Sequence, residues 1–290
     1  ETKDKTDVKQ RIITLVKRHD TELPTLPVIV NAILSAASDV KTSTEDLAKV
    51  ITNDQGITNK LLRLANSVYY GQRTRVDTIK RAITVIGFDE VIGITLGMNV
   101  LSAFADKSSG LPLDMKALWI HSIGCATAAK EIATRTNPAI AKKIFIPGLL
   151  HDMGKVIFSI YFRDEYKMVR ETAMEERKTL YKVEPATFRM NHAVLSGLLM
   201  KRWRFPNSIL YPCRFHHNPD ACPVEFRHQA LIVNMADYLC HKAHIGHSGN
   251  PVPVAVISAA QKTGLNQAAL RLIVEMLRKK EDQIKEFFEI

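Results

Sequence analysis

The sequence predicts an all-α protein, a helical bundle with a substantial apolar core. Apolar residues recur with the three- and four-residue spacing of amphipathic helices along most of the 290-residue chain, and no segment alternates convincingly as a strand would. Aromatic residues make up only 7% of the chain, whereas Ala, Leu, Ile and Val are plentiful, and this mixture favours helices. A hydrophobic content of 46% is sufficient for a large core.

The first three helices are predicted from apolar spacing and from capping residues. The first predicted helix has one apolar face, made of Val8, Ile12, Leu15 and Val16. This helix ends before LPTLP, residues 23–27, where the prolines impose an extended turn, and a second helix starts at Val28. Ser43 and Asp46 resemble a capping box for a third helix.

Three further helices are predicted before the middle of the chain. The stretch GITNKLLRLANSV, residues 56–68, forms an amphipathic helix that Gly71 closes. Another helical face comprises Ile79, Ala82, Ile83 and Ile86. The nearly all-apolar segment 88–105 predicts a buried helix.

A linker divides the predicted fold into two helical subdomains. DKSSGLPLD, residues 106–114, is small, polar and interrupted by Gly and Pro, so we place the boundary there, between residues 1–110 and 111–290. Beyond it, Asp114 is a predicted helix cap and Pro147 suits a first helical turn. Later helices are predicted around His192, over Pro206–His217, around Asp237, and as one long helix from Asn266.

The charge balance is basic, with forty Lys and Arg against thirty Asp and Glu, which gives a net charge of +10. Such a charge attracts phosphates, whether of nucleotides, nucleic acids or lipids. The basic residues are spread along the chain, however, and no recognition element for nucleic acid is present. We therefore do not expect nucleic acid as the partner.

Cysteine usage and hydropathy favour a soluble, cytoplasmic protein without a membrane partner. Four cysteines without a CxxC pair are no disulfide scaffold in a chain of this length. The longest uncharged run, residues 91–105, is shorter than the ~18–20 residues that span a membrane. Residues 213–222, CRFHHNPDAC, leave a structural zinc site as an alternative. The stretch CHKAHIGH, residues 240–247, predicts an exposed loop.

The stretch GLLHDMGKVIF, residues 148–158, places His151, Asp152 and Lys155 in an apolar helical segment. Ionisable groups are costly to bury unless they pair or bind something. The side chains of adjacent helical residues point about 100° apart. His151 and Asp152 can therefore both reach one centre only if that centre lies beside the helix between them, as a metal ion does. Histidine with carboxylate suits iron, manganese, zinc or nickel, and other helices must complete the ligand shell.

Such residues are present on other predicted helices, and their order resembles the HD phosphohydrolase superfamily. The full set is His121, His151, Asp152, His192, His216, His217 and Asp237. The resemblance implies one or two divalent transition metal ions. It assigns one ion to His121, His151, Asp152 and Asp237. It assigns a second ion to His192, His216 and His217, with Asp152 bridging the two. Lys155 matches a lysine that neutralises phosphate in that superfamily, so Asp152 and Lys155 are the predicted catalytic residues.

The chain also resembles the HDOD family, the HD-related output domains of bacterial signal transduction, through motifs in its N-terminal half. The resemblance covers residues 23–237 and rests on LPTLPVIVNAIL, ITNDQGITNKLLRLANSVYYG and IKRAITVIG. No general activity is well established for the family. After His217 the chain continues NPDACPVEF without the Gly-Tyr-Pro element of HD-GYP enzymes, so cyclic di-GMP hydrolysis is not implied.

Two functions follow as hypotheses. The first is a metal-dependent phosphohydrolase acting on a nucleotide or another phosphate-containing small molecule. The second is a non-enzymatic signalling module that binds a protein partner and keeps a residual metal site. Basic residues flank the ligand-bearing helices and suit either a phosphate-rich ligand or a solvated surface, namely Arg189, Lys201, Arg202, Arg204 and Arg214.

Overall fold

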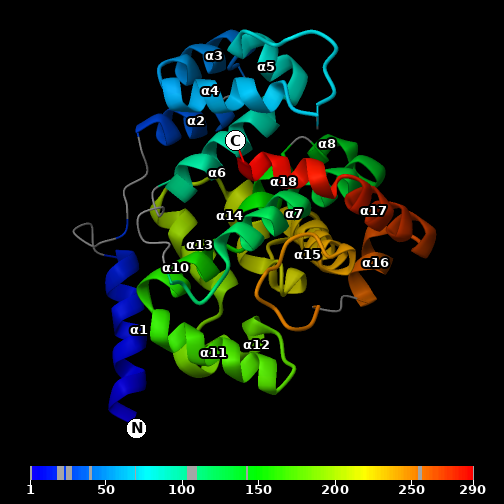
Figure 1. Ribbon diagram of the computed structural model, residues 1–290. Coiled ribbons are helices and arrows are strands. Elements are labelled where there is room, and N and C mark those ends of the chain that lie inside the picture. Colours follow the sequence, from blue (N-terminus) through cyan, green and yellow to red (C-terminus); the bar gives the residue numbers. More distant parts are fainter. Residues whose placement is uncertain are drawn as a thin grey trace.

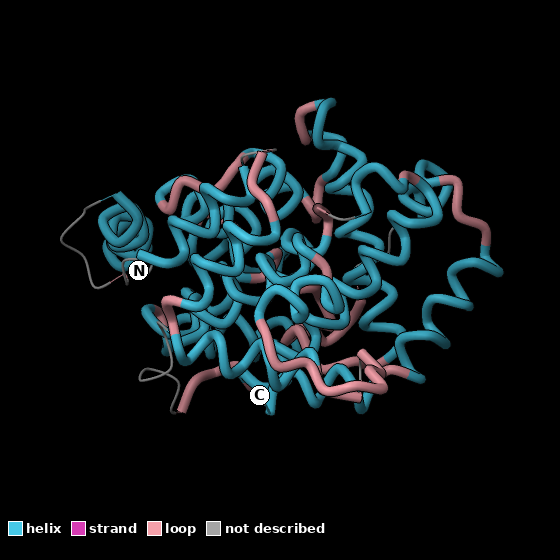
Figure 2. Tube along the Cα trace, turned by 90° about the horizontal axis from the view of Figure 1, so that it is seen from above, coloured by secondary structure: helices cyan, strands magenta, loops and turns pink. Residues whose placement is uncertain are grey.

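A computed structural model of the chain (Figure 1) describes residues 2–17, 23, 28–38, 41–68, 70–102, 110–141, 143–253 and 257–289. Regular structure in these residues is helical throughout, with no strand. The view from above shows the same helices joined by loops (Figure 2). The predicted all-α class is therefore confirmed, and most buried apolar side chains of the described residues form one core cluster.

The N-terminal half contributes one separate helix and a layer that packs on α6 (Figure 1). These helices are α1 (Thr2–Lys17), α2 (Val28–Ser38), α3 (Thr44–Thr52), α4 (Gln55–Ala65), α5 (Ile79–Ile86) and α6 (Phe88–Ser102). The predicted capping box is present at α3, where the Ser43 hydroxyl accepts from the Asp46 N–H and the Asp46 carboxylate accepts from the Ser43 N–H, both at 3.1 Å. Local sequence therefore sets where α3 begins.

Helix α4 ends at Ala65, and not at Gly71 as predicted. The Asn66 amide donates to the carbonyls of Leu62 at 2.7 Å and Val76 at 2.8 Å, while its oxygen accepts from the Val76 N–H at 2.8 Å. These bonds satisfy the end of the helix and bind it to the following loop.

The second half surrounds the long central helix α7, which packs against α9 and α15. Its elements are α7 (Met115–Thr136), α8 (Pro138–Ala141), α9 (Phe145–Leu150), α10 (Met153–Tyr161), α11 (Arg163–Glu175), α12 (Leu180–Phe188), α13 (His192–Arg202), α14 (Asn207–Phe215), the 3-10 helix η2 (Pro219–Ala221), α15 (Val224–Ala243), α16 (Ile257–Thr263), α17 (Gln267–Lys279) and α18 (Glu281–Glu289). The Asp114 carboxylate accepts from the Ala117 N–H at 2.9 Å and caps α7, as predicted.

Two segments that the sequence predicts as continuous helices are broken. The one that carries His151 and Asp152 divides into α9 and α10, because the backbone at Asp152 leaves helical geometry with φ −95° and ψ 12°. The C-terminal tail divides at Lys280 into α17 and α18. This break allows α17 to pack on α15 while α18 packs on α7.

The two halves of the chain are in close contact. A Cβ at Gly97 of α6 would lie 2.5 Å from the Trp119 side chain of α7, so only glycine permits this approach. Buried Glu90 of α6 pairs with Lys130 of α7 at 2.5 Å. Buried packing and an ion pair therefore join α6 to the helices that carry the candidate site.

Helix α1 packs against α12 and α13 of the second half. Arg202 donates through Nη1 to the carbonyls of Leu15 at 2.6 Å and Val16 at 3.1 Å. Arg202, which the sequence leaves open between a phosphate ligand and a solvated surface, thus holds α1 in place. The division after residue 110 stays a prediction, since residues 103–109 of the linker region lie outside the described part of the chain.

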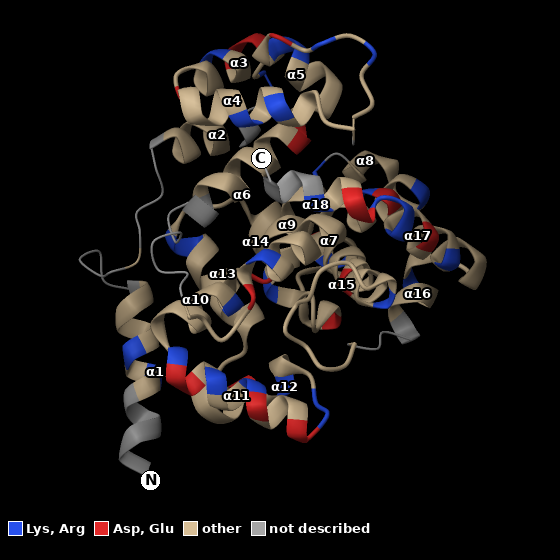
Figure 3. Ribbon diagram, in the orientation of Figure 1, with Lys and Arg blue, Asp and Glu red and all other residues tan. Residues whose placement is uncertain are grey.

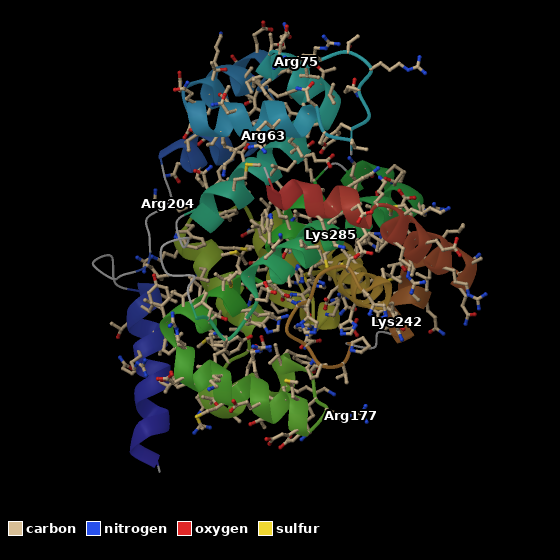
Figure 4. All side chains as sticks on the ribbon, in the orientation of Figure 1. Arg63, Arg75, Arg177, Arg204, Lys242 and Lys285 are labelled. Carbon is tan, nitrogen blue, oxygen red and sulfur yellow. The ribbon has the colours of Figure 1, made fainter. Side chains whose placement is uncertain are left out.

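No single helix among the described residues has both the length and the hydropathy to cross a bilayer. One pair, Ile79–Ile86 with Phe88–Asn99, meets both conditions together but is bent by 106°. Lys and Arg are distributed over helices throughout the molecule (Figure 3). The basic side chains labelled in Figure 4 come from separate segments, namely Arg63, Arg75, Arg177, Arg204, Lys242 and Lys285.

Candidate metal centre

The structure brings the predicted ligand residues together among α7, α9, α10, α13, α14 and α15. Their positions are His121 within α7, His151 and Asp152 between α9 and α10, His192 at the start of α13, His216 and His217 after α14, and Asp237 within α15. All except half-buried His217 are at most 4% exposed. Groups that titrate are therefore concentrated where water is largely excluded.

The break between α9 and α10 is fixed by α13. The buried Ser196 hydroxyl donates to the His151 carbonyl at 3.0 Å and accepts from the Gly154 N–H at 2.8 Å. A Cβ at Gly154 would lie 2.1 Å from the backbone oxygen of His192, so this contact requires glycine. Backbone packing thus holds the adjacent His151 and Asp152, called the HD pair below, beside His192.

Two histidines are anchored so that one ring nitrogen of each stays available. His151 Nδ1 lies 2.8 Å from the Gly148 carbonyl, and His216 Nδ1 lies 2.7 Å from the Cys213 carbonyl. A carbonyl only accepts, so each Nδ1 carries a proton and each Nε2 can present a lone pair. Neither Nε2 has a hydrogen-bond partner among the described residues. Buried, partnerless imidazole nitrogens fit a metal ion.

The first group of donor atoms joins α7 to α15. His121 Nε2 lies 3.1 Å from Asp237 Oδ1 and 3.3 Å from Cys125 Sγ. With His151, these residues offer donor atoms that all lie within 4.8 Å of one another. Metal bonds of ~2.0–2.3 Å allow one ion to contact donors at such separations.

The second group joins α13 to the end of α14. His192, His216 and His217 offer nitrogens within 4.8 Å of one another, and His192 Nε2 lies 2.9 Å from His217 Nε2. The His217 ring stacks on Tyr181 with the ring centroids 4.5 Å apart. The structure therefore includes His217 in this group.

Asp152 lies between the two groups. Its Oδ2 is 3.4 Å from His151 Nε2, and its Oδ1 is 3.3 Å from His192 Nε2 and 3.9 Å from His216 Nε2. Asp152 Oδ1 has no hydrogen-bond partner among the described residues. The carboxylate therefore faces donors of both groups.

The protonation states of His216 and Asp152 favour metal binding. Burial and the neighbouring imidazole of His151 lower the pKa of His216 to about 3, so this imidazole is neutral at neutral pH. Burial alone would raise the pKa of Asp152, but neighbouring His151 and the ammonium of Lys155 outweigh burial and hold the pKa below its ordinary value. A neutral imidazole and an ionised carboxylate are the forms that ligate metals.

His121 and Asp237 form an ion pair. Burial would lower the pKa of His121, but neighbouring Cys240 and Asp237 outweigh burial and raise the pKa to about 10. Burial would raise the pKa of Asp237, but its hydrogen bond with His121 lowers it. A metal at this position therefore has to displace a proton from His121.

Comparison with known proteins assigns the family. The model of the HDOD domain matches residues 23–219, more than half of the chain. The chain belongs to the HDOD domain family. An uncharacterized protein of Treponema pallidum (strain Nichols) is 24% identical over 210 residues, which cover 71% of this chain and 40% of that protein. The HDOD chain thus spans less than half the length of this curated relative.

Solved structures share the fold of this HDOD chain. An HDOD domain protein with unknown function from Geobacter sulfurreducens has 25% identity and a TM-score of 0.78, with 99% of this chain and 97% of that chain covered. A candidate signal transduction protein from Marinobacter aquaeolei VT8 has 19% identity and a TM-score of 0.80, with 99% and 67% covered. A candidate phosphohydrolase from Shewanella amazonensis SB2B has 18% identity and a TM-score of 0.72, with 95% and 96% covered.

Lys155 of this HDOD chain is 1% exposed and points into the site. Its ammonium donates to Asp152 Oδ2 at 2.6 Å and to the Ser248 carbonyl at 3.1 Å. Of the predicted exposed loop, residues 240–247, His244 and His247 are exposed, but the first four residues belong to α15. The His247 N–H donates to the Ala117 carbonyl of α7 at 2.9 Å and holds the chain just before Ser248 in place. A structured segment therefore positions the lysine.

Glu184 is a site residue that the sequence does not reveal. It is fully buried in α12, and its carboxylate accepts from the His192 N–H and lies 2.7 Å from His192 Nδ1. The Tyr166 hydroxyl lies 3.2 Å from the same carboxylate. A carboxylate on the outer nitrogen of a histidine orients the ring and directs its Nε2 toward the metal position.

We expect Glu184→Gln to weaken metal binding about 10- to 100-fold, because the amide keeps the shape of the carboxylate but loses its charge and one acceptor. Metal titration by calorimetry measures the effect, and exposed Glu175→Gln serves as the control. A wild-type metal affinity in a folded Glu184→Gln variant would show that Glu184 does not orient a ligand.

Cys213 and Cys222 do not form a zinc site with the neighbouring histidines. Among the described residues, neither cysteine belongs to a group of donors close enough to share an ion. Burial raises the pKa of both thiols. They are best described as small buried side chains.

Proposed function

We propose that this HDOD chain is a metal-dependent phosphohydrolase acting on a nucleotide or another phosphoester in bacterial signal transduction. One observation carries the proposal: the buried, partnerless Nε2 atoms of His151 and His216 converge with the carboxylate of Asp152. Leaving such groups unpaired costs about 1–3 kcal/mol each, so a site that binds metal explains their presence.

The donor groups fit two ions, with Asp152 facing both. Imidazole nitrogens combined with carboxylate oxygens suit iron, manganese, zinc or nickel. Bound divalent ions would supply a hydroxide nucleophile at neutral pH and positive charge for the transition state of phosphoester hydrolysis. The Shewanella protein named as a candidate phosphohydrolase shares the fold, which agrees with this reaction class.

The residues of the chain would hold and neutralise the substrate. Lys155 uses two of its three N–H donors on Asp152 and the Ser248 carbonyl. Its ammonium would neutralise a non-bridging phosphate oxygen placed beside Asp152. The net charge of +10 raises the local concentration of anionic substrates.

The test begins with elemental analysis of protein purified without added metal or chelator. We expect bound transition metal, turnover of simple phosphoesters or nucleotides with that metal, and loss of turnover after chelation that metal restores. His151→Ala is expected to lose metal and turnover, whereas exposed His244→Ala is expected to keep both. A wild-type chain without metal after reconstitution would contradict the proposal.

A second function, protein-partner binding in signalling, is favoured by one observation. The match to the HDOD family begins at residue 23, yet none of the described donor groups draws on α2–α6. A partner that binds wild type and His151→Ala equally, with no turnover by wild type, would establish this function instead.

A further inference from the structure

We infer that Cys125 supplies a thiolate ligand to the metal held by His121, His151 and Asp237. This inference rests on the proposed metal site and specifies the chemistry of one of its ions. Cys125 is fully buried on α7, four residues after His121, so the two side chains share one face of the helix. The spacing places sulfur beside the imidazole.

Distances among the donors match one coordination shell. A tetrahedral shell with bonds of ~2.0–2.3 Å separates neighbouring donors by about 3.3–3.8 Å. Cys125 Sγ lies 3.3 Å from His121 Nε2, and Asp237 Oδ1 lies 3.1 Å from the same nitrogen. All four donors, including His151, lie within 4.8 Å of one another.

An independent observation shows that a ligand belongs at this position. The Nε2 of fully buried His151 belongs to the same group as Cys125 and has no hydrogen-bond partner among the described residues. Its Nδ1 is held by the Gly148 carbonyl, so the unpartnered nitrogen is directed by the backbone toward the other donors. A lone pair aimed at a thiol, an imidazole and a carboxylate fits a cation.

A sulfur ligand changes which metals bind. Thiolate is a soft donor that suits zinc, iron and cobalt, whereas oxygen ligands suit manganese and magnesium. The nearby Cys240 is differently placed: its Sγ lies 3.4 Å from the His121 carbonyl oxygen and 3.5 Å from that of Ile245. Among the described residues, Cys240 belongs to no group of donors close enough to share an ion, whereas Cys125 does. Cys125 is therefore the thiol that serves the ion.

Cobalt(II) titration of the metal-depleted full chain, under reducing and anaerobic conditions, tests the assignment. A cobalt–thiolate bond gives a charge-transfer band in the near ultraviolet, while bound cobalt in any ligand field gives visible d–d bands. We expect both in the wild type. Cys125→Ala is expected to lose the near-ultraviolet band and to bind zinc more weakly relative to manganese, while buried Cys222→Ala keeps the wild-type spectrum.

The outcomes separate this inference from the proposed function. Visible bands without a near-ultraviolet band in the wild type would overturn the thiolate ligand and leave the metal site standing. The same conclusion follows if folded Cys125→Ala keeps the band and Cys240→Ala loses it. No cobalt or zinc binding by the wild type would overturn both the ligand and the proposed function.

Discussion

Asp152→Asn is expected to remove bound metal and phosphoester turnover together. The Asp152 carboxylate is 3.4 Å from His151 Nε2 and 3.3 Å from His192 Nε2, so it faces both donor groups. Asparagine keeps its shape but is neutral and a weaker ligand. We expect turnover to fall by more than the ~10²–10³-fold cost of one lost hydrogen-bond donor, because the activated nucleophile is lost as well. Elemental analysis and steady-state kinetics measure both effects.

The control for this substitution has to separate charge from ligation. Asp152→Asn leaves the ammonium of Lys155 buried without its charged partner, which destabilises the fold. The double variant Asp152→Asn/Lys155→Met removes both charges, and we expect it to lose metal equally while regaining stability. Exposed Asp164→Asn is expected to behave as wild type. Wild-type metal content in Asp152→Asn would exclude Asp152 from the site.

Local rules in the sequence predict where helices begin. Ser43 with Asp46, and Asp114 with Ala117, are three residues apart, so each cap depends only on its own turn of chain. The periodic apolar faces likewise predict the all-α class, since burial of one face is the main requirement for each helix. These features need no information about distant segments.

The break at the HD pair could not be predicted in this way. His151 and Asp152 lie in an apolar stretch that reads as one helix, yet α9 ends before them and α10 starts after them. The break depends on Ser196 and on the approach of the His192 backbone to Gly154, which are contacts between segments far apart in sequence. The tertiary contacts override local helical preference here.

Glu184 and Cys125 show two different reasons for missing a site residue. Glu184 acts on His192 from another helix, and nothing in its local sequence marks it as buried. Cys125 stands four residues after His121 on a predicted helix, a spacing that places both on one face, so that signal is present in the sequence. The third and fourth neighbours of a ligand on a helix are thus the positions at which the sequence indicates a further donor.

Lys155→Met is expected to lower turnover by about 10²–10³-fold while metal content stays near the wild-type level. The ammonium lies 2.6 Å from Asp152 Oδ2 and is held by the Ser248 carbonyl at 3.1 Å, so it is fixed beside the position where phosphate would bind. Methionine fills similar volume without charge. When metal is bound, its positive charge compensates Asp152 in place of the lysine, so ligation does not require the ammonium.

The measurement pairs elemental analysis with kcat and KM for one phosphoester. Exposed Lys182→Met of α12 is the matched control and is expected to leave both unchanged. Loss of turnover with metal retained assigns Lys155 to the substrate phosphate. If Lys155→Met loses metal in proportion to its activity, the lysine serves only to hold Asp152, and neutralisation of the phosphate must come from other residues.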